Sequence, residues 1–383
     1  MQNKFPFDKI IIKPDDIDLS YSPIKKDLNN LSDNRRIDTY ILGAFNPGMS
    51  RLPSGNIILM VRIAEALKTP VFNNKIHCIR WDTDKAYVID EYNTDEVDTS
   101  DPRSFILKKY YPLQVFALTS LSWILPVELS ADGQEIIKIH YNKIIAPVKS
   151  YQEYGIEDAR ISFIEGKYYM TTCSVSSERL CTTLYSSVNG LDYTLEGVVL
   201  DHQNKDMLLF EGKINKKYYA LTRPLGISYL AVPPNSNYNP GPGINLTQSP
   251  DLLHWKPVDE PFIRIQSDSG KTAKLGGGAQ PILTDDGWLV LFHGVEETGE
   301  IGIYNTYYAI LDSQNPSVIL KSDAQNPVLT SLPKLTENLK DQLYIENVVF
   351  TTGILDNDDN YIVASGENDL CCRITHIPKS YFN

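Results

Sequence analysis

The feature that most constrains the fold is an internal repeat of short strand-like segments rich in Val, Ile, Tyr, Phe and Thr. Copies of the segment begin at Gly55, Gly166, Lys216, Gly287 and Asn360. A second strand-like run precedes each copy, and these runs begin at Tyr40, Glu157, Lys205, Lys274 and Ile345. Because short turns join the two partners, each pair is typical of an antiparallel β-hairpin.

Five hairpins in series predict a five-bladed β-propeller, in which four-stranded blades surround a central channel. The chain shows no long amphipathic helix and no change of composition typical of a linker. We therefore expect an all-β protein in which residues 1–383 form a single propeller domain, with short N- and C-terminal extensions packed on it. The active site is expected at one mouth of the channel.

The composition excludes several classes of partner. Lys and Arg number 36 against 48 Asp and Glu, a net charge of −12 that disfavours nucleic acid. The five cysteines form no CxxC pair, which disfavours a disulfide framework or a thiolate zinc site. Neither a signal sequence nor a membrane span is predicted, and we expect a cytoplasmic protein whose oligomeric state stays open.

Polar residues at the hairpin ends carry the functional prediction. In an antiparallel hairpin, the start of the first strand lies beside the end of the second, opposite the turn. If the five hairpins are inner strands of blades, the residues at these ends gather at one mouth of the channel. The set comprises Asn46, Arg62, Glu157, Asp158, Ser174, Lys205, Asp206, Arg223, Lys274, His293, Glu367 and Asp369.

Glu157 and Asp158 head a strand with apolar residues behind them. Such a setting is expected to desolvate a carboxyl group and raise its pKa for general-acid catalysis. The alternative is an ordinary pair at a strand start, capped by Arg160.

Four cationic or polar donors stand at the same hairpin ends, namely Lys205, Arg223, Lys274 and His293. Their number and charge suit a dianion such as phosphate. Glycines 276–278 are expected to let backbone amides approach that anion. The alternative, compatible with the first, is that the cations form structural ion pairs with Asp158, Asp206 and Glu211.

The pattern favours a particular chemistry. The histidines lack metal-binding spacing and no GxSxG motif occurs, so we expect neither a metal nor a serine nucleophile. Glycosidic-bond cleavage normally uses two carboxyl groups, whereas one acid candidate here faces a basic cluster. Inorganic phosphate as the attacking co-substrate would replace the second carboxylate. The predicted reaction is reversible phosphorolysis of a carbohydrate, without a cofactor.

Several ordered motifs resemble those of glycoside hydrolase family 130, the five-bladed β-mannoside phosphorylases and β-mannosidases. They include FNPG from Phe45, GIEDARI from Gly155, LTRP from Leu221, LGGGAQPI after Lys274 and WLVLFHG from Trp288. The resemblance runs from about residue 46 to residue 369.

The resemblance implies inverting phosphorolysis of a β-mannoside to α-mannose 1-phosphate and a shortened acceptor sugar. It implies that Asp158 is the general acid and donates its proton through the mannose 3-hydroxyl. Asn46, Arg62 and Asp369 would bind the mannose, and we place Glu157 with them. The phosphate ligands would be Lys205, Arg223, Lys274 and His293.

Two departures from the family pattern keep alternatives open. Glu211 follows Phe210 where the family commonly has proline, and the C-terminal motif reads ASGENDL from Ala364. An inverting β-mannosidase, with Asp158 as acid and Glu211 as base, is the first alternative. A sugar-binding propeller without catalysis is the second.

Overall fold

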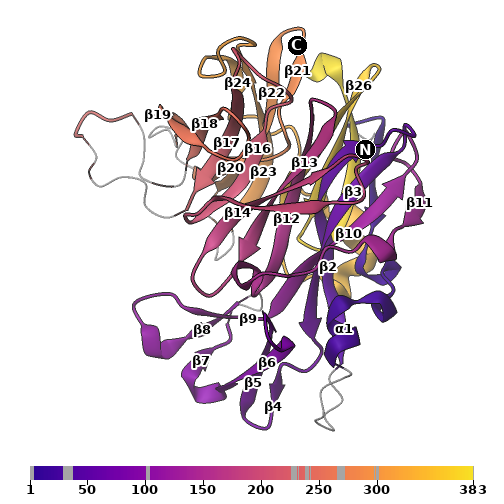
Figure 1. Ribbon diagram of the computed structural model, residues 1–383, viewed down its shortest axis with the longest axis vertical. Coiled ribbons are helices and arrows are strands. Elements are labelled where there is room, and N and C mark those ends of the chain that lie inside the picture. Colours follow the sequence, from indigo (N-terminus) through magenta and orange to yellow (C-terminus); the bar gives the residue numbers. More distant parts are fainter. Residues whose placement is uncertain are drawn as a thin grey trace.

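A computed structural model describes residues 4–28, 38–100, 104–225, 231, 233–237, 241, 243–264, 272–296, 298 and 302–382. Strands dominate these residues (Figure 1), and the helix α1 (Pro23–Leu28) is short. The predicted all-β class is therefore confirmed. No helix among the described residues is long and apolar enough to span a bilayer.

The strands fall into antiparallel groups that follow one another along the chain. The first group contains β2 (Thr39–Arg51), β3 (Ile57–Leu67), β10 (Ser120–Leu129) and β11 (Ile136–Ile139). The second contains β12 (Gly155–Ile164), β13 (Lys167–Val175), β14 (Leu180–Ser187) and β15 (Thr194–Leu200). The third contains β16 (Asn204–Leu209), β17 (Tyr218–Pro224), β18 (Ile244–Ser249) and β19 (Lys256–Ile263).

The fourth group contains β20 (Thr272–Gly277), β21 (Ile282–Thr284), β22 (Gly287–Glu296), β23 (Ile303–Leu311) and β24 (Ile319–Asp323). The fifth contains β25 (Val349–Asn357), β26 (Asn360–Glu367), β27 (Cys371–Pro378) and the N-terminal β1 (Phe7–Ile12). A parallel bridge between Ser122 and Gly155 joins the first two groups into one sheet. The described strands form no closed sheet.

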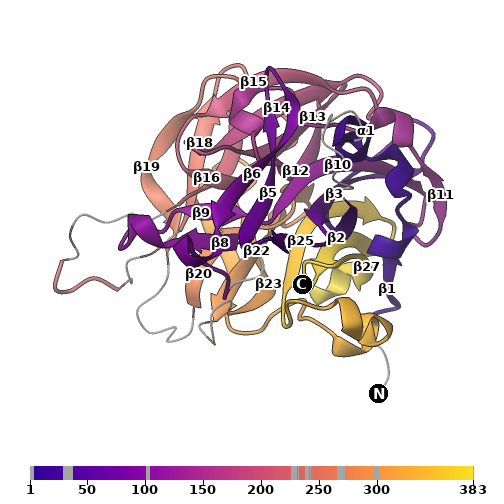
Figure 2. The ribbon, with the colours of Figure 1, turned by 90° about the horizontal axis from the view of Figure 1, so that it is seen from below.

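Two small sheets are inserted between β3 and β10. They consist of β4 (Val71–Phe72), β5 (Lys75–Asp82) and β6 (Ala86–Asn93), and of β7 (Val97–Asp98), β8 (Ser104–Leu107) and β9 (Phe116–Leu118). Figure 1 shows them at the lower end of the long strands, and Figure 2, seen from below, shows them in front. The insertion therefore covers the end of the molecule where β3 ends and β10 begins.

Short 3₁₀ helices complete the described structure. They are η1 (Pro14–Asp16), η2 (Leu19–Tyr21), η3 (Thr94–Glu96), η4 (Lys108–Tyr110), η5 (Tyr141–Lys143), η6 (Ser150–Gln152), η7 (Pro333–Gln342) and η8 (Lys379–Tyr381).

The predicted hairpins are present as antiparallel pairs: β2–β3, β12–β13, β16–β17, β22 with β20 and β21, and β25–β26. Apolar cores lie between neighbouring groups rather than within one sheet. One cluster joins Met49 and Trp123 of the first group to Ile362 and Ile374 of the fifth. Burial of such side chains contributes roughly 1.5–3 kcal/mol each, which fixes how the groups pack.

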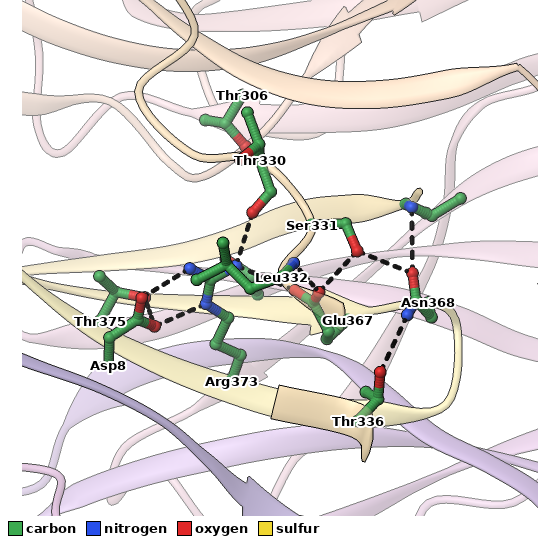
Figure 3. Close-up of polar contacts among 12 residues, drawn as sticks. Asp8, Thr306, Thr330, Ser331, Leu332, Thr336, Glu367, Asn368, Arg373 and Thr375 are labelled. Atoms are coloured by element: carbon green, nitrogen blue, oxygen red, sulfur yellow. Dashed lines mark hydrogen bonds and ion pairs between the residues drawn. The ribbon is translucent and has the colours of Figure 1, made fainter. Parts of the chain in front are cut away.

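The N-terminal strand β1 is fastened to β27 by a buried charge network (Figure 3). The Arg373 guanidinium donates to both carboxylate oxygens of Asp8, at 2.6 and 2.7 Å, and to Glu367 at 2.9 Å. The Arg373 side chain is 1% exposed, so its charge depends on these two acids for compensation.

We expect Asp8→Asn to lower the free energy of unfolding by about 3 kcal/mol, because the variant leaves a buried guanidinium with one acid instead of two. Unfolding in urea measures the loss. Asp15→Asn, at an exposed residue of η1, is the control and should change stability by less than about 0.5 kcal/mol. An equal effect of both variants would contradict this account of the network.

Candidate active site

A repeated β-bulge brings three polar side chains to equivalent positions in successive strand groups. The pairing register skips between Phe45 and Gly48 of β2, between Glu157 and Arg160 of β12, and between Lys205 and Leu208 of β16. Inside the three bulges, Asn46, Asp158 and Asp206 have φ angles of 47°, 50° and 57°. Asn and Asp tolerate this left-handed backbone better than most residues, and bulges often redirect side chains at active sites.

Asp158 lies at the centre of the site. Its Oδ1 accepts hydrogen bonds from Asn46 Nδ2 and from Arg62 Nη1, each at 3.0 Å. The Arg160 guanidinium approaches from the other side and donates to the backbone carbonyl of Asp158 at 2.8 Å. The carboxylate thus pairs with one guanidinium group, and a second is fixed to the backbone of the same residue.

This setting corrects the expectation of a raised pKa for Asp158. Burial alone would raise the pKa, but attraction to Arg62, Arg160 and Lys205 outweighs it and holds the pKa well below its usual range. Asp158 is therefore ionised in the free protein. If Asp158 acts as an acid, its carboxylate must gain a proton when a ligand binds.

Glu157 joins the mannose-side and phosphate-side residues of the sequence prediction. It accepts from Arg62 Nη2 at 2.8 Å through one carboxylate oxygen and from Lys205 Nζ at 3.0 Å through the other. Arg62 also donates to Ser122 Oγ at 3.0 Å and stacks over the Phe45 ring. The Glu157 carboxylate therefore connects Arg62 to Lys205, and further contacts hold Arg62 in place.

A second ion-pair chain continues from Asp158 toward β22. Arg160 donates to Asp206 Oδ1 at 3.2 Å, and Arg223 Nε lies 3.0 Å from Asp206 Oδ2. Arg223 Nη1 in turn lies 3.1 Å from His293 Nε2. The structural ion pairs expected as an alternative are therefore present, with Glu157 and Asp206 as their acids.

His293 was predicted as a cationic or polar phosphate ligand, and its environment excludes the cationic form. Its side chain is 1% exposed, and burial, together with Arg223 and Arg160, lowers its pKa to about 3 although Asp206 opposes the shift. Because an arginine only donates, the neutral imidazole accepts at Nε2 and carries its proton on Nδ1. His293 holds Arg223 in place.

The glycine run at residues 276–278 allows close packing around Arg223 and His293. A Cβ at Gly276 would lie 2.7 Å from Arg223 Cδ and closer still to the His293 ring. The Gly278 amide donates to Leu291 within the sheet. The Gly278 amide is therefore already paired within the sheet, and Gly276 makes room for the Arg223–His293 pair.

Lys274 and Asp369 complete the convergent set. Lys274 stands on β20 two residues before Gly276, so its side chain leaves the strand on the same face. Asp369 follows β26 in a turn with Asn368, where both residues have positive φ angles of 48° and 56°. The charges of Glu157, Asp158 and Asp369 together raise the pKa of Arg62 against the effect of desolvation, which places Asp369 on the Arg62 side.

Glu211 lies away from the site. In the β16–β17 pair, Lys205 faces Arg223 at one end, whereas Glu211 precedes the turn between Ile214 and Lys217 at the other. Its carboxyl group lies beside the Phe163 backbone, and desolvation raises its pKa to about 7 although the residue as a whole is exposed. In this position Glu211 is too far along the hairpin to act as a hydrolytic base near Asp158.

One member of the predicted set, Glu367, lies in another network, and the role of Arg160 was underestimated. Glu367 accepts from Arg373, Ser331 and Leu332 in the network of Figure 3, outside the catalytic cluster. Arg160 was treated only as a cap, yet it links Asp158 to Asp206. The GIEDARI motif did not reveal this link, because alternate residues on a strand share a face only where no bulge intervenes, and a bulge lies between Glu157 and Arg160.

No group of His, Cys, Asp and Glu among the described residues is arranged to hold a metal ion. A family model described as beta-1,4-mannooligosaccharide phosphorylase matches residues 117–381, more than half of the chain. The chain belongs to glycoside hydrolase family 130. This membership confirms the predicted family and the predicted class of enzyme, a glycoside phosphorylase.

Relatives with named activities resemble the family 130 protein over most of its length. A β-1,2-mannobiose phosphorylase of Listeria innocua is 29% identical over 340 residues, covering 86% of this chain and 87% of the relative. A 1,2-β-oligomannan phosphorylase of Thermoanaerobacter sp. is 32% identical over 250 residues, covering 63% and 74%. The solved Listeria innocua enzyme in complex with β-1,2-mannobiose superposes with a TM-score of 0.76 at 26% identity, covering 97% of this chain and 95% of that one.

The lowered pKa of His293 predicts a pH dependence of stability. Between pH 6.5 and pH 3 the unfolded chain binds a proton at this position that the folded chain does not, so stability falls as pH falls through this window. Acidification should therefore destabilise the wild type more than His293→Gln, by up to about 1.4 kcal/mol per pH unit. Urea unfolding at several pH values measures the difference.

His254→Gln is the control, because the His254 side chain is 82% exposed. Parallel stability profiles for the wild type and His293→Gln would show that His293 has the same pKa in the folded and unfolded chain, which would contradict this account.

Proposed function

We propose that the protein catalyses inverting phosphorolysis of a β-mannoside and releases α-mannose 1-phosphate and a shortened acceptor saccharide. The observation that carries the proposal is the neighbourhood of Asp158. The buried Asp158 carboxylate stands beside an array of cations whose positions are set by Glu157 and Asp206.

We also propose that the five strand groups are the blades of a propeller with the site at one mouth. The antiparallel groups of four or five strands support this arrangement, and so do the equivalent bulges in β2, β12 and β16. Such bulges would point inward from successive blades.

Inorganic phosphate would bind between Lys205, Arg223 and Lys274. The first two face each other across the β16–β17 pair and are held by Glu157 and Asp206. Cations fixed beforehand bind an anion with little further loss of side-chain entropy. Neutral His293 would contribute by holding the Arg223 guanidinium.

The mannose would lie over Asn46, Arg62, Glu157 and Asp369, next to the phosphate. Arg62 joins Glu157 and Asp158 through two separate nitrogens, so it sets the spacing between the sugar and the acid. Phosphate would attack the anomeric carbon from the face opposite the leaving oxygen, which inverts the configuration.

The proton balance explains how an ionised Asp158 serves as the acid. HPO₄²⁻ loses its proton as its oxygen forms the bond to the anomeric carbon, and the leaving oxygen gains one as its bond breaks. Dianion binding would offset the pull of Arg62, Arg160 and Lys205 on Asp158 and thereby raise its pKa, so that Asp158 takes up a proton from solvent. Asp158 would then give that proton to the leaving oxygen, through the mannose 3-hydroxyl as the family resemblance implies, and the proton that the phosphate loses would return to solvent.

The relatives that span most of the chain support β-1,2-linked mannosides as the substrate to test first. A β-1,4 linkage, which the description of the family model names, is the second. The hydrolytic alternative loses its proposed base because Glu211 stands at the far end of its hairpin.

The decisive measurement incubates β-1,2-mannobiose and β-1,4-mannobiose with and without inorganic phosphate. We expect α-mannose 1-phosphate only when phosphate is present, and Glu211→Gln should retain kcat within twofold. Free mannose released at the same rate without phosphate, and lost in Glu211→Gln, would instead establish the hydrolase.

Asp158→Asn should lower kcat at least 100-fold, because the amide cannot carry the proton to the leaving oxygen. Initial rates with phosphate and mannobiose measure the loss. Asp201→Asn, at an exposed position outside the site, is the matched control and should keep the wild-type rate. Retained activity in Asp158→Asn would rule out this residue as the acid.

Gly276→Ala should raise the KM for phosphate at least tenfold, because the new methyl group displaces Arg223 and His293. The KM for the mannoside should change less. Leu283→Ala, at an exposed position on β21 of the same sheet, is the control. If a folded Gly276→Ala variant kept the wild-type KM for phosphate, Arg223 would not be a phosphate ligand.

A further inference from the structure

A cavity lies where the inserted hairpin β5–β6 meets the second strand group. Its volume is about 330 Å³, within the range of small-ligand pockets. One wall is formed by Arg80, Trp81 and Asp82 of β5, and another by Ser150 and Tyr151 of η6. The turn Ser176–Arg179 between β13 and β14 forms the third.

The cavity stands at the same end of the second group as Asp158. In the β12–β13 pair, Gly155 faces Val175 at this end, whereas Ile164 and Lys167 flank the turn at the other. The walls at residues 150–153 and 176–179 are the chain segments that enter β12 and leave β13. Asp158 lies five residues beyond the lining residue Glu153, so at most roughly 17 Å of extended chain separates the cavity wall from the acid.

A hydrogen-bonded path joins the cavity to the mannose-side residues. The Tyr154 amide donates to Val175, and the Tyr154 carbonyl accepts from the Ser122 amide at 3.4 Å. Ser122 Oγ accepts from Arg62, which contacts Asp158. The backbone of Tyr154 and the side chain of Ser122 therefore connect the cavity wall to the residues around Asp158.

Ion pairs hold the polar groups of the cavity in place before any ligand arrives. Arg80 donates to Asp90 at 2.9 Å and to Glu153 at 3.2 Å. Glu153 accepts from the Ser177 amide at 2.9 Å through its other oxygen, and its backbone carbonyl accepts from the Trp81 amide at 2.8 Å. The inserted hairpin and the second group thus form one preorganised surface.

We propose that this cavity binds the leaving-group side of the substrate, that is, the saccharide that accepts mannose in the reverse reaction. The inference rests on the proposed function. The chemistry fits a polyhydroxylated ring: fixed guanidinium and carboxylate groups pair with hydroxyls, and the aromatic rings of Trp81 and Tyr151 offer an apolar contact. The insertion between β3 and β10 then determines which acceptors are used.

The test uses two substitutions that each place a large side chain in the cavity. Ser177→Trp and Thr83→Trp each place an indole at an exposed turn position on a different wall. Synthesis is measured from α-mannose 1-phosphate with mannose or β-1,2-mannobiose as acceptor. We expect the acceptor KM to rise at least tenfold, more for mannobiose, with the KM for α-mannose 1-phosphate within twofold of the wild type.

Val188→Trp is the matched control, because Val188 is 72% exposed at a turn on the opposite end of the same strand group. An unchanged acceptor KM in both cavity variants, with an active wild type, would overturn this inference alone. No synthesis by the wild type from any acceptor would overturn the proposed function and this inference with it.

Discussion

The arrangement of the site depends on the attraction between buried carboxylates and guanidinium groups across bulged strands. Asp158 sits between Arg62 and Arg160, and Asp206 sits between Arg160 and Arg223. Arg62 bridges two acids, Arg160 an acid and a backbone carbonyl, and Arg223 an acid and the His293 ring, so each of these charges faces at least one acid. Such networks cost desolvation energy, and their benefit is fixed geometry rather than stability.

These alternating acids and guanidinium groups join three strand groups into one surface around Asp158. Arg62 comes from the first group, Asp158 and Arg160 from the second, and Asp206 from the third. A shift of one group relative to its neighbour would break a buried ion pair. The apolar cores between groups and the polar network between bulges therefore impose the same relative placement.

Much of the fold and the site could be predicted from sequence because the signal was periodic. The hairpins followed from repeated strand patterns, and their polar ends identified Asn46, Arg62, Asp158 and Arg223. The bulges were not predictable, because the strands β2, β12 and β16 are largely buried on both faces around them and show no alternation that an extra residue could interrupt. For the same reason the contact from Arg160 to Asp206 was missed, as was the lowered pKa of Asp158 that follows from it.

Glu211 shows where sequence position misleads. It follows Phe210 only a few residues after Lys205, yet an extended strand carries it to the far end of the hairpin. The charge state of His293 could not be predicted from the sequence either, because it depends on burial beside Arg223 and Asp206. Residue type indicates what a side chain can do, and its environment selects among those roles.

The pairing of β1 with β27 bears on the order in which the site forms while the ribosome makes the chain. Asp8 and Arg373 are separated by 365 residues, and the sheet that they close also carries the turn with Asp369. Contacts of such long sequence separation form late, because loop closure must precede them. A growing chain would thus assemble the Asp158–Arg62 cluster first and gain the Asp369 side of the sugar site only when its two ends meet.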